Sequence, residues 1–227
     1  MNSIEIRDVS KIYDIAGQTI RAVDNVNLQV TRGDFVSIVG HSGSGKTTLL
    51  SILGGIIRPT SGNVMYDGKD LCLLDDDGLS AYRNRKIGFM FQFASLLPIL
   101  TAKENVLLPG LFSGLPQADD GKRAEEYLEM VGLGDKIKAY PSQLSGGQQR
   151  RVAIARALIN EPELILADEP TGDLDEETEA EIMGLFVRLN RERKVTFIFI
   201  THNLDLAGQA QRQFRMTQGV IREIPAL

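Results

Sequence analysis

The chain has 227 residues and a formal net charge of −5, so it lacks the basic footprint of a general nucleic-acid-binding protein. Hydrophobic residues make up 43% of it, which is enough for the packed core of one large domain. The one cysteine, Cys72, excludes an intrachain disulfide. We expect no secretory signal and no membrane helix, since no apolar run approaches roughly 18–20 residues; a membrane role would therefore need a partner.

The N-terminal part of the chain shows the alternation of polar and apolar residues that is typical of one-sided strands. Residues 4–9 and 26–30 alternate in this way and predict an antiparallel β part. Residues 35–39 are apolar almost throughout, as in a strand that is buried on both faces. Residues 47–53 follow as a helix, which Gly54 and Gly55 end.

Helical signals dominate the middle of the chain. Apolar stripes at residues 124–131 and 152–159 predict helices, and we expect residues 96–157 to form an inserted helical lobe. Two further apolar runs, 164–167 and 195–200, flank a helix that opens near Asp175. The alternation predicts an α/β fold with a mostly parallel core sheet, in one domain of residues 1–227 whose core comprises 1–95 and 158–227.

Residues 40–47 match the pattern G-x-x-x-x-G-K-[ST], between a predicted strand and a predicted helix. Glycines allow successive backbone N–H groups to turn toward phosphate oxygens, and the helix N-terminus adds positive character. We expect Lys46 to reach the β- and γ-phosphates of ATP and Thr47 to bind Mg²⁺. His41 contributes its backbone. The residues expected to hold the nucleotide here are Gly40, His41, Ser42, Gly43, Ser44, Gly45, Lys46, Thr47 and Thr48.

Two carboxylates follow the apolar run at 164–167, namely Asp168 and Glu169. Ligands of open parallel sheets bind at the carboxyl ends of strands, and buried carboxylates need a partner such as Mg²⁺. Asp168 is the candidate metal ligand, and Glu169 the candidate general base for water. His202 ends the third apolar run and is a candidate γ-phosphate contact. The alternatives are a solvated strand end and a structural histidine.

A second glycine motif, Ser145-Gly146-Gly147-Gln148, precedes the helix at 152–159. It has a capping serine, a bare glycine backbone and a helix N-terminus, which together form another anion-binding site. A chain that binds one nucleotide has little use for two such sites. The economical interpretation is that two copies of the chain share each ATP.

With this second motif, the sequence resembles the ATP-binding-cassette (ABC) ATPases over essentially its whole length. The resemblance implies that Tyr13 stacks on adenine, and that Gln92 contacts Mg²⁺ and couples to a membrane partner. Asp168 and Glu169 match its Walker B carboxylates, residues 172–175 its D-loop, and His202 its switch histidine. Tyr13 as a surface aromatic, Gln92 as a plain polar residue and Asp175 as a helix N-cap are the alternatives. The implied site is completed by Asp173, and the implied metal ligands are Thr47, Gln92 and Asp168.

The family implies a head-to-tail dimer, formed with itself or a related subunit, in which Ser145, Gly146, Gly147 and Gln148 face the ATP held by Lys46 of the other copy. The sequence is similar to the lipoprotein-release and macrolide-exporter branch in residues 91–93, 96–98, 104–106 and 140–144. Asp173 and Asn203 depart from that branch, which more commonly has Asn and Asp there. The branch implies a separate permease at the inner membrane, with residues 93–97 lining the groove that accepts it on the cytoplasmic face; ordinary lobe core is the alternative.

The leading hypothesis is therefore an ATPase that drives export, lipoprotein extraction or mechanical signalling through a permease. One rival is a regulatory module that controls an envelope enzyme through a permease-like partner and moves no solute. A DNA- or ribosome-directed ABC ATPase and a P-loop kinase are further rivals, disfavoured by the single cassette and by the second glycine motif, respectively. The charge runs at 75–77 and 83–86 are interpreted as solvated surface.

Overall fold

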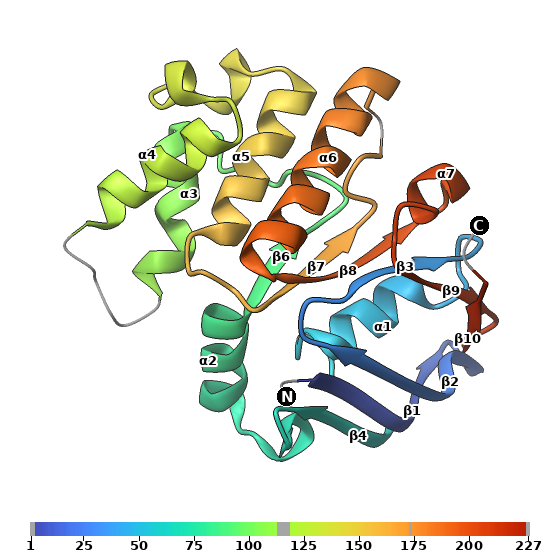
Figure 1. The fold of residues 1–227 in the computed structure, drawn as a ribbon. Coiled ribbons are helices and arrows are strands. Elements are labelled where there is room, and N and C mark those ends of the chain that lie inside the picture. Colours follow the sequence, from blue (N-terminus) through green and yellow to red (C-terminus); the bar gives the residue numbers. More distant parts are fainter. Residues whose placement is uncertain (1–2, 113–118, 173, 226–227) are drawn as a thin grey trace.

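The computed structural model describes residues 3–112, 119–172 and 174–225, and within them the chain forms two sheets with helices packed on and between them (Figure 1). The larger sheet has the strand order β10-β9-β3-β8-β7-β6. All its neighbours pair in parallel except β10 and β9. Its strands are β3 (Phe35–Val39), β6 (Ile87–Met90), β7 (Leu164–Asp168), β8 (Thr196–Thr201), β9 (Arg212–Thr217) and β10 (Val220–Ile224).

The smaller sheet is antiparallel and has the order β2-β1-β4-β5. The predicted N-terminal strands are confirmed, and both are longer than expected. Irregular register between Ile6 and Ile12 allows β1 to continue past the alternating segment. The strands are β1 (Ser3–Ile15), β2 (Gln18–Thr31), β4 (Ser61–Tyr66) and β5 (Lys69–Asp70).

The helices form two groups. α1 lies between the two sheets, whereas α5 and α6 cover the opposite face of the parallel sheet, with α3 and α4 packed outside α5 (Figure 1). The α-helices are α1 (Lys46–Leu53), α2 (Asp76–Lys86), α3 (Ala102–Leu111), α4 (Asp120–Met130), α5 (Gly146–Leu158), α6 (Glu176–Arg193) and α7 (Leu204–Ala207). Short 3₁₀ turns cover Leu71–Leu73 (η1), Gly134–Lys136 (η2) and Pro141–Gln143 (η3).

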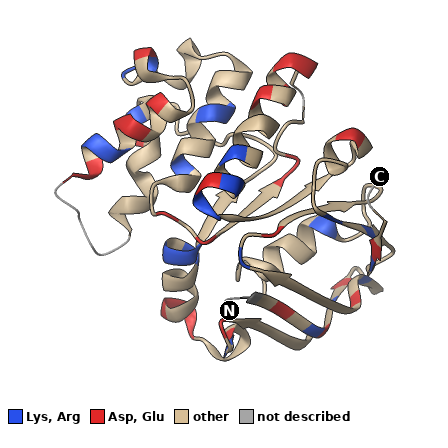
Figure 2. Ribbon diagram, viewed as in Figure 1, with Lys and Arg blue, Asp and Glu red and all other residues tan. Residues whose placement is uncertain are grey.

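The central strands are apolar throughout because each of their faces is buried. In β8, Phe197 and Phe199 point into the core under α5 and α6, while Ile198 and Ile200 point into the core around α1. All four of these side chains are fully buried. In Figure 2 the charged residues of both signs are spread over outer helices such as α2, α4 and α6, and the strands between the layers are largely uncharged. This burial on both faces is what a parallel sheet requires.

Several elements escaped the sequence prediction. β6 has only four residues and contains Gly88, and β9 mixes buried apolar with polar positions, so neither shows a clear strand pattern. The charge runs interpreted as solvated surface belong to α2, where Asp75–Asp77 are exposed but Lys86 forms an ion pair with Glu163. The interpretation as solvated surface therefore holds for Asp75–Asp77 and Arg85, whereas Arg83 and Lys86 are half-buried.

Among the described residues, no helix is both long and apolar enough to cross a membrane. The division into a core and a lobe of residues 96–157 stays a prediction. One continuous hydrophobic cluster joins α3, α4 and α5 to the face of the parallel sheet, so the helical layer and the sheet share a core.

Candidate active site

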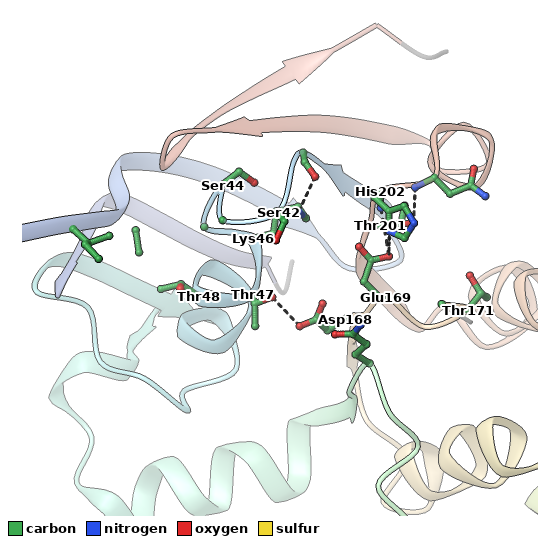
Figure 3. A pocket seen from close by; sticks show the side chains of 18 of the residues that line it. Ser42, Ser44, Lys46, Thr47, Thr48, Asp168, Glu169, Thr171, Thr201 and His202 are labelled. Carbon is green, nitrogen blue, oxygen red and sulfur yellow. Dashed lines mark hydrogen bonds and ion pairs between the residues drawn. The ribbon is translucent and has the colours of Figure 1, made fainter. Parts of the chain in front are cut away.

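A cleft of about 730 Å³ opens at the carboxyl ends of β3, β7 and β8 (Figure 3). The three predicted strand ends do lie along one edge of the sheet. Arg150 of α5 fixes one wall, because its guanidinium donates to the carbonyls of Phe91 and Gly172 at 2.9 and 3.2 Å. The cleft is lined by these predicted residues: Gly40, Ser42, Gly43, Ser44, Gly45, Lys46, Thr47, Thr48, Gln92, Asp168, Glu169 and His202.

The loop between β3 and α1 is shaped by close contact with other backbone segments. A Cβ on Gly40 would lie 2.3 Å from the Met216 carbonyl oxygen of β9, and one on Gly45 would lie 1.9 Å from that of Ala22. Gly45 also has φ of +102°, which favours glycine. The N–H of Gly219 in the β9–β10 turn donates to the Ser44 carbonyl at 3.0 Å. The glycines are therefore required by packing as well as by the motif.

Lys46 is the charged group at the base of this loop. The residue is only 8% exposed, and its Nζ donates to the carbonyls of Gly40 and His41 at 2.8 and 3.1 Å. No side chain of the described residues caps α1 at Gly45, and the buried Ser44 hydroxyl likewise has no hydrogen-bond partner among them. Open N–H donors, a lysine and a free hydroxyl together make an anion-binding site.

Beside the loop, the Thr47 hydroxyl donates to Asp168 Oδ2 at 2.9 Å (Figure 3). Burial raises the pKa of Asp168, and the hydrogen bond from Thr47 partly offsets this. Hard oxygen donors of this kind suit Mg²⁺. Within the described chain no group of three or more His, Cys, Asp or Glu residues is arranged to hold a metal.

The side chains of Glu169 and His202 lie next to each other at the cleft (Figure 3). Nδ1 of His202 is 3.1 Å from Glu169 Oε2. The Glu169 side chain is 16% exposed and that of His202 is 76% exposed. Glu169 has φ of +46°, an uncommon conformation for a residue with a side chain, and its N–H is held by the Ile200 carbonyl. A carboxylate and an imidazole therefore face the space next to the phosphate loop.

Residues 23–172 match the family model described as ABC transporter. The chain belongs to the ABC transporter family. It binds ATP and is an ATPase of that family.

Relatives of this ABC ATPase cover nearly all of the chain. The lipoprotein-releasing system ATP-binding protein LolD of Syntrophus aciditrophicus is 44% identical over 96% of this chain and 98% of its own. The macrolide export ATP-binding/permease protein MacB of Syntrophobacter fumaroxidans is 48% identical over 97% of this chain, which spans 31% of that protein. A dimeric post-hydrolysis structure of the ATP-binding cassette MJ0796, bound to ADP and Pi, has a TM-score of 0.91 at 44% identity over 99% of both chains.

Several predicted residues of this ABC ATPase lie elsewhere. Tyr13 does not line the cleft; Lys11 stands over its ring, and its cross-strand neighbour Ile20 lines the cleft instead. The His41 side chain is also absent from the lining, and its backbone carbonyl accepts a hydrogen bond from Lys46. Asp173 lies outside the described residues.

The Ser145–Gln148 motif is likewise outside the cleft, at the N-terminus of α5. The Ser145 hydroxyl accepts the Gln148 N–H at 3.2 Å, and Gln148 Oε1 accepts the Ser145 N–H at 2.9 Å. The motif is thus a capping box that is satisfied within its own chain.

Sequence reasoning missed a second group of lining residues. Some of these residues lie on β2. The others lie in the segment after β7, on α6 or on either side of His202. No phosphate-binding motif marks any of these positions. Only nearness in sequence to Glu169 and His202 could have suggested a few of them. They are Ile20, Arg21, Ala22, Thr171, Glu179, Thr201 and Asn203. Gly172 and Leu174 also line the cleft, and both belong to the segment that the family resemblance had matched to the D-loop.

A second hollow, a groove of about 530 Å³, lies between α2, β6, α3 and α5. Of the five residues predicted to line a partner groove, the structure places only Ser95 in it. Phe93 is 67% exposed and Leu97 is 45% exposed outside it, whereas Leu96 packs against the core. The Ala94 carbonyl binds Arg156, which does line the groove.

Proposed function

We propose that this ABC ATPase is the motor subunit of a membrane complex, and that two cassettes close head to tail around ATP. The observation that carries the proposal is that the two anion-binding motifs of one chain do not lie in the same cleft. One cleft collects Lys46, Asp168, Glu169 and His202, while the Ser145–Gln148 motif lies outside it in the same chain. A second anion-binding motif that does not face the nucleotide site of its own chain could instead bind the γ-phosphate of ATP held by a partner cassette.

Within the cleft each residue has a proposed task. Lys46 exchanges the carbonyls of Gly40 and His41 for the β- and γ-phosphates, whose remaining oxygens accept N–H donors of the loop and of α1. Thr47, Asp168 and Gln92 would hold Mg²⁺, which would neutralise charge on the phosphates. Tyr13, beside Ile20 at the edge of the cleft, is the proposed adenine contact.

Glu169 is the proposed general base. Its carboxylate accepts a proton from the attacking water, and His202, 3.1 Å from the same carboxylate, holds the γ-phosphate and orients that water. The largely exposed His202 ring can leave Glu169 for the phosphate without unpacking the core. Thr48 and Asp173 complete the proposed set of nucleotide contacts.

Sharing of the site has a direct test in mixed dimers. Lys46→Ala removes the phosphate contact of one chain, and Ser145→Arg blocks the motif that would face the other chain's ATP. Each variant alone should hydrolyse ATP poorly. An equimolar mixture should recover activity, because one heterodimer site pairs an intact Lys46 with an intact Ser145. A mixed dimer that assembles and recovers nothing would count against sharing.

The groove between α2 and α5 is the proposed docking site for a permease. Its lining includes apolar Ile56, Phe89 and Phe91, and its charged lining residues among those described are Arg83 and Arg156. Burial lowers the pKa of Arg156, and both guanidiniums bind backbone carbonyls of this chain. An apolar segment that carries a carboxylate would complement this groove.

The relatives named LolD and MacB support a place in the lipoprotein-release and macrolide-export branch. The proposed role is therefore to drive export, lipoprotein extraction or transmembrane mechanical signalling from the cytoplasmic face of the inner membrane. The alternative is a regulatory module that controls an envelope enzyme through a permease-like partner. The periplasmic domain of the partner distinguishes the two.

Cysteine cross-linking identifies that partner. In a Cys72→Ser background, Ser80→Cys places a thiol in the groove, and Ser142→Cys places one on the exposed 3₁₀ turn before α5. With native membranes, the thiol at position 80 should cross-link to a polytopic membrane protein and that at 142 should not. Equal yields from the two positions would exclude the groove as the docking site.

A further inference from the structure

The side chain of Asn203, directly after His202, forms hydrogen bonds through both its amide oxygen and its amide nitrogen. Its Oδ1 accepts the N–H groups of Asp205 and Leu206, at 2.9 and 3.4 Å, and so caps α7. Because the oxygen is committed to these donors, the amide nitrogen must face the other way. There Nδ2 donates to Glu179 Oε1 at 3.3 Å. The orientation of the amide is therefore fixed by its surroundings.

This hydrogen bond joins two segments that meet at the cleft. Both Glu179 and Asn203 are half-buried and line the cleft. Glu179 lies in the first turn of α6, where its N–H donates to the carbonyl of the helix cap Asp175. The Asn203 N–H donates to the buried Thr201 hydroxyl at 3.0 Å. The turn that carries His202 is thus tied to α6 on one side and to β8 on the other.

His202 itself has little to hold it. Its side chain is 76% exposed, and the hydrogen-bond partner that the described residues give its ring is Glu169. When Glu169 turns to water, as the proposed mechanism requires, that contact weakens. The bond between Asn203 and Glu179 is independent of Glu169 and would remain.

The same turn of α6 also touches the second glycine motif. A Cβ on Gly147 would lie 2.6 Å from Cγ2 of Thr178, the residue before Glu179. Thr178 is in turn held by Asp175 through its N–H and its hydroxyl, at 2.9 and 2.8 Å. One helical turn therefore contacts the motif that would serve the partner's ATP and the turn that carries His202.

We propose that Glu179 and Asn203 form a positioning pair that sets His202 against the γ-phosphate from the first turn of α6. The inference rests on the proposed role of His202. An aspartate at 203 would instead place its second carboxylate oxygen against Glu179. The pair requires a hydrogen-bond donor on one side chain and an acceptor on the other, which two carboxylates cannot supply.

Exchange of the two groups tests this requirement. Asn203→Asp keeps an oxygen to cap α7 but sets carboxylate against carboxylate, and kcat for ATP should fall about tenfold, within the usual coupling of contacting polar groups. Glu179→Gln keeps an acceptor for Asn203 and should stay within about threefold of wild type. The double variant restores the bond with donor and acceptor reversed, so its kcat should return to within about threefold of Glu179→Gln.

Three controls separate positioning from loss of structure. ATP affinity and the thermal midpoint of Asn203→Asp should match wild type, since only the His202 turn shifts. Asn203→Ser, which can cap α7 but cannot reach Glu179, should lose kcat similarly. Wild-type kcat in Asn203→Asp, no recovery in the double variant, or a parallel loss of ATP affinity would each overturn the pair. If His202→Ala also hydrolyses ATP normally, the proposed role of His202 fails instead.

Discussion

Two glycine-rich helix N-termini in this ABC ATPase look alike in sequence and differ in structure. The N-terminus of α1 follows Gly45, is capped by no described side chain and opens into the cleft. That of α5 follows Ser145, whose hydroxyl and whose partner Gln148 close a capping box on the surface. The first leaves its N–H donors available to phosphate, whereas the second satisfies part of its own.

The difference separates catalysis from closure. Only the α1 end is accompanied by a buried lysine, a threonine hydroxyl and strand-end carboxylates, so only that end can carry out chemistry. The α5 end brings no acid, base or metal ligand, and it becomes part of a site only when another surface supplies a phosphate. A glycine motif at a helix N-terminus thus indicates an anion-binding site. The residues around it determine whether the anion is bound by the same chain or supplied by a partner.

The largest expected effect removes the chemistry and leaves closure intact. Glu169→Gln keeps a polar group of the same size beside His202 but cannot accept a proton from water, so hydrolysis should slow by about 10²–10⁴-fold. ATP binding should persist, and an ATP-bound dimer should accumulate. Phosphate release and size-exclusion chromatography with ATP measure the two properties.

The matched control is Glu192→Gln, an exposed carboxamide substitution on α6, which should hydrolyse ATP as wild type does. If Glu169→Gln turned over at the wild-type rate, the assignment of the general base would be wrong. If it lost ATP binding as well, Glu169 would be needed for more than hydrolysis, and the separation of catalysis from dimer closure would be wrong.

The next effect concerns the open helix end. Gly45→Ala forces a Cβ to within 1.9 Å of the Ala22 carbonyl at φ of +102°, and it should lower the free energy of unfolding by about 2–4 kcal/mol and abolish ATP binding. Gly17→Ala is matched in its positive φ but has open space around it, so it should cost only about 1 kcal/mol. Urea denaturation and ATP titration distinguish them; equal losses would mean that close packing does not shape the loop.

The smallest effect concerns the closed helix end. Ser145→Ala removes the acceptor of the Gln148 N–H, so the free energy of unfolding should fall by about 1 kcal/mol. ATP binding to the single chain should not change, because Ser145 lies outside its cleft. Ser142→Ala, at an exposed position before the helix, should leave both properties unaltered. Weaker ATP binding by the monomeric Ser145→Ala variant would contradict the separation of the two ends.

The chemistry-bearing edge was predictable because its signals are local. The apolar runs that became β3, β7 and β8 end in Gly40, Asp168 and His202, and parallel strands place their carboxyl ends together. Gly45 followed by Lys46 likewise announced the start of α1, and Asp175 the start of α6. Each of these inferences depends on residues adjacent in sequence.

What escaped prediction depends on residues distant in sequence. Nothing in Ser44 foretells that its hydroxyl is buried without a partner, because β9 and β2 close around it. The contact of Asn203 with Glu179 joins residues on different elements, and no local sequence pattern distinguishes either residue from its neighbours. Tyr13 was assigned by resemblance, and the cross-strand register that puts Ile20 at the cleft could not be inferred from β1 alone.

The shape of the phosphate loop has a consequence for what counts as a complete site. Residues 23–172 match the family model, yet the backbone that presses on Gly40 belongs to Met216, and the turn that holds Ser44 contains Gly219. A fragment that stopped at residue 172 would retain every letter of the glycine motif and lose the wall against which the loop is moulded. The glycine motif is local in sequence, but the conformation of its loop depends on residues near the C-terminal end of the chain.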